Sequence, residues 1–270
     1  MLGESKLAHF HDFCYKKFSF SVANSLALPT YMLQLMSTQD LKTVQEVTAT
    51  LFDGVQGLFN KDKENFYLVG YSFGSLIALE LAKMMEARGM RGQIVLIDGA
   101  PAFLKKLVVD QMPDAHSEEA VQSVLISGIL RTIYPEENID VLQILTNYPT
   151  WELRLEKLLH MSTDQYLYTT EYLRKMANCL YQRIKMVIDF KSDPTHILKS
   201  PITLVRPTEI SIVDVEEDYG LHKLCNGNTN VKYVEGNHLT MLENPKLIQM
   251  INELDPALES NRSFKKHNAI

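Results

Sequence analysis

The chain has 270 residues, of which 46% are hydrophobic and 22% are charged, an ordinary composition for a globular protein. At roughly 150 residues per domain, this length suits two domains or one large α/β domain. Lys and Arg together number 27 and Asp and Glu number 33, and the resulting net charge of −6 argues against a nucleic-acid-binding protein. No apolar stretch reaches the ~18 residues needed for a membrane span, and residues 1–6 lack the basic start and apolar core of a signal peptide.

The cysteines and histidines form neither a disulfide framework nor a recognisable metal site. The three cysteines, Cys14, Cys179 and Cys225, are widely spaced and form no CxxC pair. An odd number of distant cysteines is typical of reduced thiols, so we expect a cytoplasmic protein. His9 and His11 are the only histidines close together, and we identify no further ligands to accompany them, so we predict no metal.

The N-terminal part of the chain alternates short apolar runs with longer segments of helical periodicity. Strands are expected at 30–35, 66–69 and 94–97. A first helix is expected over 40–58, begun by Asp40, and a second over 75–88, closed by Gly89. This alternation is typical of βαβ units and predicts an α/β fold with a mainly parallel sheet.

The alternation stops between residues 102 and 198, where helical periodicity continues but no strand is evident. Helices are expected at 117–134, 139–148 and 163–190. Strands return at 202–205 and 231–234, and a helix follows at 245–254. We therefore predict an α/β core formed by 1–101 and 199–258, a helical cap formed by 102–198, and a flexible tail at 259–270.

The pattern Gly70-Tyr71-Ser72-Phe73-Gly74 stands between a predicted strand and a predicted helix, the context in which G-x-S-x-G presents a nucleophilic serine. The turn is so tight that the positions two residues before and two residues after the serine need small side chains, which explains both glycines. A glycine-flanked turn without catalytic function has the same letters, but the strand and helix around it favour the nucleophile. We assign the Phe73 N–H, at the start of the helix, to the oxyanion hole and Tyr71 to substrate binding.

A serine nucleophile needs a base and an acid, and in α/β-hydrolases these follow it in the order acid, then histidine. The best base is His238, which lies in a glycine-containing loop just after the last predicted strand. Two positions are open for the acid: Asp98 directly follows one predicted strand, and Glu209 and Asp214 follow the next. The tighter strand-end placement favours Asp98, with Gly99 indicating a sharp turn behind it.

Segments 65–80, 93–100 and 219–244 resemble the thioesterase domain of animal, insect-like type I fatty acid synthase, and the resemblance extends over about residues 18–254. The motifs that carry it are VGYSFG at 69–74, LIDG at 96–99 and VEGNH at 234–238. The resemblance implies an α/β-hydrolase fold whose helical cap is inserted between the acid and histidine strands. It also implies a catalytic triad of Ser72, Asp98 and His238, no metal or bound cofactor, and release of a fatty acid from the phosphopantetheine arm of an acyl carrier protein.

The chain departs from this family near its N-terminus. The family has a His-Pro-x-Glu-Gly-like loop that supplies a second oxyanion N–H, whereas the matching stretch here is Phe10-His11-Asp12-Phe13-Cys14. We therefore expect the N-terminal part of the sheet to be shortened. Whether the chain is a free protein or part of a larger synthase stays open. Two alternatives stay open: a degenerate thioesterase-like fragment that binds acyl chains or a carrier protein, and a generic carboxylesterase or lipase.

Overall fold

The computed structural model describes residues 7–11, 25–26, 30–34, 41–58, 65–110, 117–133, 144, 146–162, 169–193, 195–209, 214–226 and 228–254. Contacts within the chain divide it into two compact units. One comprises Met1–Leu35, Thr43–Leu104 and Lys191–Ile270, and the other comprises Met36–Lys42 and Lys105–Phe190. No helix within the described ranges is long and apolar enough to cross a membrane.

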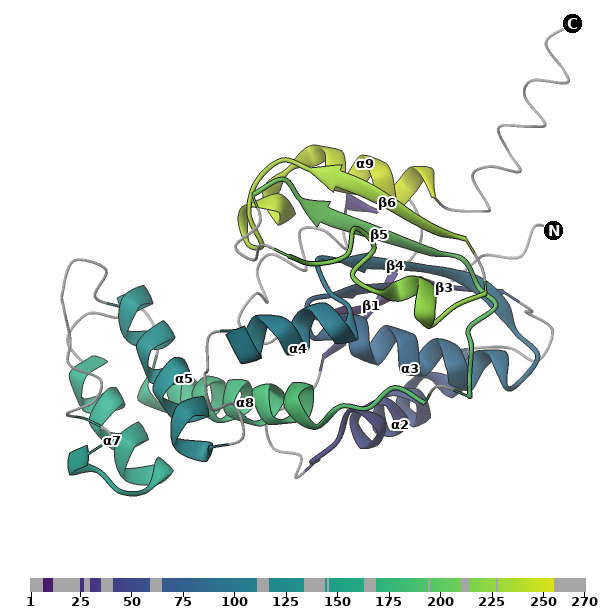
Figure 1. Ribbon diagram of the computed structural model, residues 1–270. Helices are drawn as coiled ribbons and strands as arrows, with labels where there is room; N and C mark the ends of the chain where they lie inside the picture. Colours follow the sequence, from purple (N-terminus) through teal and green to yellow (C-terminus); the bar gives the residue numbers. More distant parts are fainter. Residues whose placement is uncertain are drawn as a thin grey trace, which may run out of the picture. The chain divides into compact units, whose positions relative to one another are not determined.

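A six-stranded sheet forms the centre of the first unit (Figure 1). Its strands are β1 (Leu7–His11), β2 (Thr30–Gln34), β3 (Asn65–Tyr71), β4 (Arg91–Ile97), β5 (Ile202–Pro207) and β6 (Thr229–Val234). They lie in the order β2-β1-β3-β4-β5-β6, and every neighbouring pair is parallel. The predicted α/β fold with a mainly parallel sheet is confirmed.

The N-terminal strand β1 occupies a central place in this sheet, because it pairs with β2 on one side and with β3 on the other. It has five residues, against seven in each of β3 and β4. The sheet position next to β3 is therefore occupied by β1, which is shorter than β3. Residues 12–14, which belong to the stretch that matches the family's oxyanion loop, lie outside the described residues.

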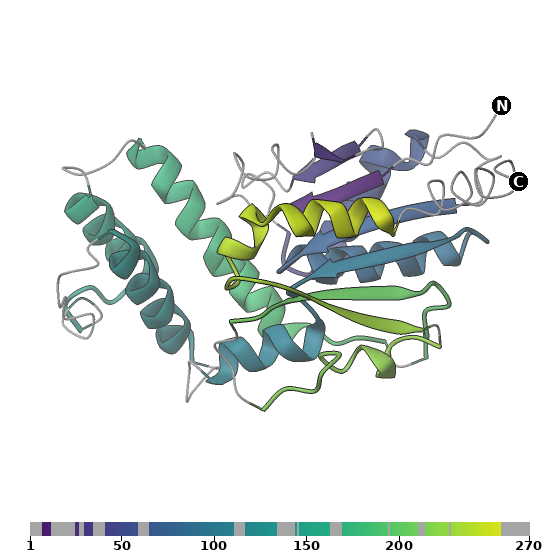
Figure 2. The same ribbon diagram turned by 90° about the horizontal axis from the view of Figure 1, so that it is seen from above.

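Both faces of the central strands are buried, which explains why their sequences are continuous apolar runs rather than alternating ones. One face packs against α9 (Pro245–Glu253), and Figures 1 and 2 show α3 (Gly74–Glu86) on the opposite face, with α2 (Val44–Val55) packed against α3. The cluster on the α9 face includes Tyr67, Val69, Val95, Ile97, Leu247 and Ile251. The candidate site is built at the C-terminal ends of strands of this sheet.

Side-chain caps fix where two of these helices begin. The Thr43 hydroxyl accepts from the Glu46 N–H and the Glu46 carboxylate accepts from the Thr43 N–H, a capping box that begins α2. The helix expected from Asp40 was placed too early, because residues 41–43 are not helical and α2 begins at Val44, where the Thr43 cap fixes its start. Asn244 caps α9 by accepting from the Lys246 N–H, in agreement with the helix predicted from residue 245.

The second unit is helical. Its helices are α5 (Glu118–Ile133), α7 (Trp151–Ser162) and α8 (Thr170–Asp189), and the division between the units falls within α4 (Pro101–Asp110). The sequence predicted neither α4 nor α7, and the helix expected from residue 163 begins only at Thr170, where the Thr169 hydroxyl accepts from the Tyr172 N–H. Most of the helix expected at 139–148 lies outside the described residues. Buried leucines and isoleucines of α5, α7 and α8 form a core within this unit.

Candidate active site

The turn between β3 and α3 presents Ser72 with a left-handed backbone, at a φ of 52°. A serine with positive φ is strained, so the surrounding structure must hold it. The Ser72 N–H donates to the Ile97 carbonyl at 3.0 Å, and the Ser72 carbonyl accepts from the Ser75 N–H at 2.9 Å. A Cβ on Gly70 would lie 2.6 Å from the Gly74 carbonyl oxygen and 2.8 Å from Ser75 Cα. The close approach of the neighbouring backbone therefore requires glycine at position 70, as the tight turn predicted.

A second left-handed residue, Asp98, follows β4 with a φ of 42°. Its N–H donates to the Val205 carbonyl of β5 at 2.8 Å, so the acid is anchored between two strand ends. The turn behind it packs directly on the serine turn, because a Cβ on Gly99 would lie 2.4 Å from Ser75 Oγ and 2.5 Å from the Ser72 carbonyl oxygen. The Asp98 side chain is only 3% exposed.

His238 joins the serine to the acid. Its Nδ1 lies 2.6 Å from Asp98 Oδ2, and its Nε2 lies 3.1 Å from Ser72 Oγ. With the Nδ1 proton donated to the carboxylate, Nε2 is left to accept the serine proton, which is the tautomer that nucleophilic catalysis needs. The structure thus brings together the three residues proposed as a triad. The carboxylate that meets His238 is that of Asp98, which favours Asp98 over Glu209 and Asp214.

The loop after β6 holds His238 through its own hydrogen bonds. Gly236 has a φ of 116°, which favours glycine. The Asn237 side-chain oxygen accepts from the Leu239 and Thr240 N–H groups, each at 3.0 Å, and the Asn237 N–H donates to Thr240 Oγ1 at 2.9 Å. The histidine therefore sits in a tight turn whose polar backbone groups are bonded locally.

Tyr71 and Phe73 flank the serine, and both are largely buried. The Tyr71 hydroxyl donates to the His238 carbonyl at 2.8 Å, and its ring stacks on the imidazole with 4.9 Å between centroids. Tyr71 is 1% exposed, and its assignment to substrate binding stays a prediction. Phe73 is the N-cap residue of α3, the position predicted for the oxyanion donor.

Sequence reasoning missed Tyr219, which also contacts the acid. Its hydroxyl donates to Asp98 Oδ1 at 2.8 Å, and the side chain is buried. Tyr219 lies 121 residues from Asp98 along the chain, in a loop between β5 and β6 that has no recognisable local motif. Only its position within segment 219–244 could have drawn attention to it.

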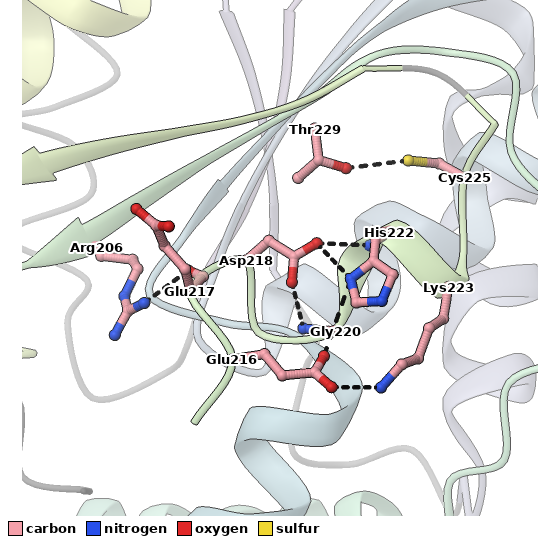
Figure 3. Close-up of polar contacts among 9 residues, drawn as sticks. All are labelled: Arg206, Glu216, Glu217, Asp218, Gly220, His222, Lys223, Cys225 and Thr229. Carbon is pink, nitrogen blue, oxygen red and sulfur yellow. Dashed lines mark hydrogen bonds and ion pairs between the residues drawn. The ribbon is translucent and has the colours of Figure 1, made fainter. Parts of the chain in front are cut away.

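Glu216, Asp218 and His222 form the group of potential metal ligands found among the described residues, with one ligand atom of each lying within 4.8 Å of the others. Figure 3 shows that these side chains contact one another and their neighbours. Asp218 accepts from the Gly220 and His222 N–H groups and meets the His222 ring, while Glu216 pairs with Lys223 at 2.6 Å. We interpret these contacts as anchors of the loop that carries Tyr219.

The chain matches a known protein family and is similar in fold to solved structures. Residues 12–254 match the family described as Thioesterase domain. The fold is similar to that of a four-domain nonribosomal peptide synthetase, holo-AB3403 bound to AMP and glycine, with a TM-score of 0.70, 17% identity and coverage of 94% of this chain and 20% of that chain. This chain therefore spans about a fifth of the length of the synthetase.

Two further similar structures are of lengths closer to that of this chain. One is the type II thioesterase BorB from the borrelidin biosynthetic cluster, with a TM-score of 0.62, 18% identity and coverage of 94% of this chain and 93% of that chain. The other is RedJ-thioesterase from the prodiginine pathway of Streptomyces coelicolor, with a TM-score of 0.58, 13% identity and coverage of 94% and 85%. At these identities the likeness shows the fold alone.

Proposed function

The chain belongs to the thioesterase domain family, and we propose that it releases a fatty acid by hydrolysing an acyl thioester held on the phosphopantetheine arm of an acyl carrier protein. The observation that carries this proposal is the hydrogen-bonded series from Ser72 through His238 to Asp98. That series supplies the nucleophile, the base and the orienting carboxylate that acyl transfer through a serine requires.

In the proposed reaction, Ser72 Oγ attacks the thioester carbonyl carbon while His238 Nε2 takes the serine proton. The carbonyl oxygen becomes an oxyanion, to which the Phe73 N–H donates, and Asp98 stabilises the imidazolium. Collapse of the tetrahedral intermediate breaks the carbon–sulfur bond, and His238 returns the proton to the leaving sulfur. Water, deprotonated by His238, then attacks the acyl-serine ester, which releases the fatty acid and restores Ser72 with its proton.

The substrate class is supported by the resemblance to fatty acid synthase thioesterases. The motifs that carry this resemblance include the serine, the acid and the histidine, in the same order along the chain. Similar folds occur in proteins named as thioesterases of biosynthetic pathways, which supports a carrier-bound substrate. Cys179 and Cys225 form no disulfide within the described residues, which supports a cytoplasmic location.

The test is hydrolysis of palmitoyl-CoA by the purified chain beside its Ser72→Ala variant. We expect the variant to lose at least ~10³-fold in kcat with an unchanged melting temperature, because it lacks the nucleophile. Undiminished turnover in Ser72→Ala would contradict the proposal. So would the absence of hydrolysis in folded wild-type protein, a result that favours the degenerate acyl-binding fragment.

A parallel assay that compares ethyl palmitate with its thioester counterpart, S-ethyl thiopalmitate, tests the carboxylesterase alternative. Oxygen esters and thioesters of the same acyl chain differ only at the leaving group, so the acyl contacts are held constant. We expect a higher kcat/KM for the thioester. A clear preference for the oxygen ester would overturn the thioesterase assignment while leaving Ser72 as the nucleophile.

A further inference from the structure

Tyr219 and His238 occupy different oxygens of the same carboxylate. The Tyr219 hydroxyl donates to Asp98 Oδ1 at 2.8 Å, while His238 Nδ1 lies 2.6 Å from Asp98 Oδ2. A carboxylate held at one oxygen only can rotate about its terminal bond, which is soft. A carboxylate held at both oxygens has one orientation, and here that orientation aims Oδ2 at the imidazole.

The Tyr219 ring is itself held by two neighbours. It stacks on Phe103 with 3.9 Å between centroids and 3° between the ring planes. The Arg206 guanidinium lies 4.4 Å from the Tyr219 centroid, and its Nη1 donates to the Glu217 carbonyl at 2.6 Å. Tyr219 is 2% exposed and Arg206 is 5% exposed, so both contacts are shielded from water and the cation–π attraction is strengthened.

The backbone that carries the ring is unusual. Tyr219 and Gly220 both adopt the left-handed region, with φ values of 54° and 78°. Asp218 holds this turn, because its carboxylate accepts from the N–H groups of Gly220 at 2.9 Å and His222 at 2.8 Å (Figure 3). A strained tyrosine persists only where surrounding contacts fix it, and such strain is common at functional sites.

The phenol is protonated throughout the range in which the proposed triad operates. Burial and the adjacent Asp98 carboxylate raise the pKa of Tyr219 well above its usual value, and the nearby Arg206 guanidinium only partly offsets this. Because a neutral phenol donates and a carboxylate accepts, the polarity of the contact is fixed.

We propose that Tyr219 is a positioning residue for the acid. Phe103 and Arg206 hold its ring, and its hydroxyl fixes Asp98 so that the carboxylate holds His238 in the reactive orientation. This inference rests on the proposed function of the triad. It assigns Tyr219 no contact with the substrate, so its loss should lower kcat and leave KM nearly unchanged.

The test is the Tyr219→Phe variant, which keeps the stacked ring and removes one oxygen. A hydrogen bond to a charged group is worth enough to change kcat by ~10–10²-fold, and we expect a decrease in that range. The acid limb of the kcat/KM profile should also move to higher pH. A buried carboxylate that has lost a donor attracts a proton more strongly, whether the proton sits on His238 or on Asp98 itself.

The matched control is Tyr67→Phe. Tyr67 is also buried, on strand β3, and its hydroxyl donates at 2.8 Å to the Ile251 carbonyl of α9 rather than to a residue of the triad. We expect Tyr67→Phe to leave kcat and the pH profile at their wild-type values. An equal loss of kcat in both variants, or a Tyr219→Phe enzyme within twofold of wild type in kcat and in the acid limb, would overturn the inference. Should Tyr219→Phe fail to fold, Arg206→Lys, which loses the planar clamp, should show the same shift of the acid limb, and no shift would overturn the inference.

Labelling of Ser72 by a fluorophosphonate separates this inference from the proposed substrate. The reagent reports on the nucleophile and its base without an acyl thioester. Labelling in wild type that is slowed ~10-fold or more in Tyr219→Phe would support the positioning role even if palmitoyl-CoA is not hydrolysed. Equal labelling rates would overturn that role, and absence of labelling at Ser72 in folded wild type would overturn both proposals.

Discussion

Replacement of Gly99 by alanine tests whether the acid turn and the serine turn must touch. The added Cβ would lie 2.4 Å from Ser75 Oγ and 2.5 Å from the Ser72 carbonyl oxygen. Ser75 is fully buried and its hydroxyl donates to the Gly70 carbonyl at 3.1 Å, so the side chain cannot swing aside without losing that bond. Restoring even a close contact of 3.4 Å requires the two turns to separate by about 1 Å.

The expected cost follows from that displacement. Overpacking of a buried site destabilises a protein by about 1–3 kcal/mol, and the melting temperature falls by roughly 2–4 °C for each kcal/mol in a chain of this size class. Ser72 and Asp98 lie on the two turns that are forced apart, and a misplacement of ~1 Å in a catalytic arrangement costs ~10²-fold in rate. We therefore expect Gly99→Ala to lose activity far beyond its loss of stability, measured by palmitoyl-CoA turnover beside thermal unfolding.

The matched control is Gly54→Ala in α2, where an added Cβ has no neighbour within 4 Å. Alanine there reduces the entropy of the unfolded chain and should raise stability by about 0.4–1 kcal/mol without changing kcat. A Gly99→Ala variant with wild-type kcat and melting temperature would refute the close contact of the two turns. So would an equal loss of kcat in both variants.

Two further predictions concern titration. Burial acts to raise the pKa of Asp218, but hydrogen bonds from the His222 N–H, the His222 ring and the Gly220 N–H together outweigh it and lower this pKa below its usual 3.8. A carboxylate with a lowered pKa in the folded state stabilises the fold fully above its unfolded pKa and loses that contribution as the pH falls. Asp218→Asn should therefore lower the free energy of unfolding by about 1 kcal/mol at pH 7, and urea unfolding should show a smaller difference from wild type below pH 4. A difference that stays constant down to pH 3 would refute this prediction. Burial raises the pKa of the Cys179 thiol to about 11, so Cys179→Ser should leave unchanged the number of thiols that DTNB labels in native protein at pH 8, whereas a drop of one would contradict it.

The sequence predicted those elements whose signals are local. Strands β3, β4 and β5 were recognised because runs buried on both faces are continuously apolar. Ser72, Asp98 and His238 were found although His238 lies 140 residues from Asp98, because the order of the motif restricts where the partners stand. The prediction for the cap was poorer: α7 was missed and the start of α8 was placed too early. Those helices are polar outside their packed faces, and α8 begins at a local cap, Thr169, that the sequence analysis overlooked.

The position of the acid shows how one fold can use two neighbouring strand ends differently. The sequence offered two places for the carboxylate, after β4 and after β5, and favoured the first. In the structure Asp98 follows β4, and β5 supports it: the Val205 carbonyl accepts the Asp98 N–H, and Arg206 lies over the Tyr219 ring that donates to the carboxylate. The end of β5 and the loop after it thus hold the acid in place instead of providing it. An acid moved to residue 209 or 214 would lose these supports, so the two positions are not interchangeable in this chain.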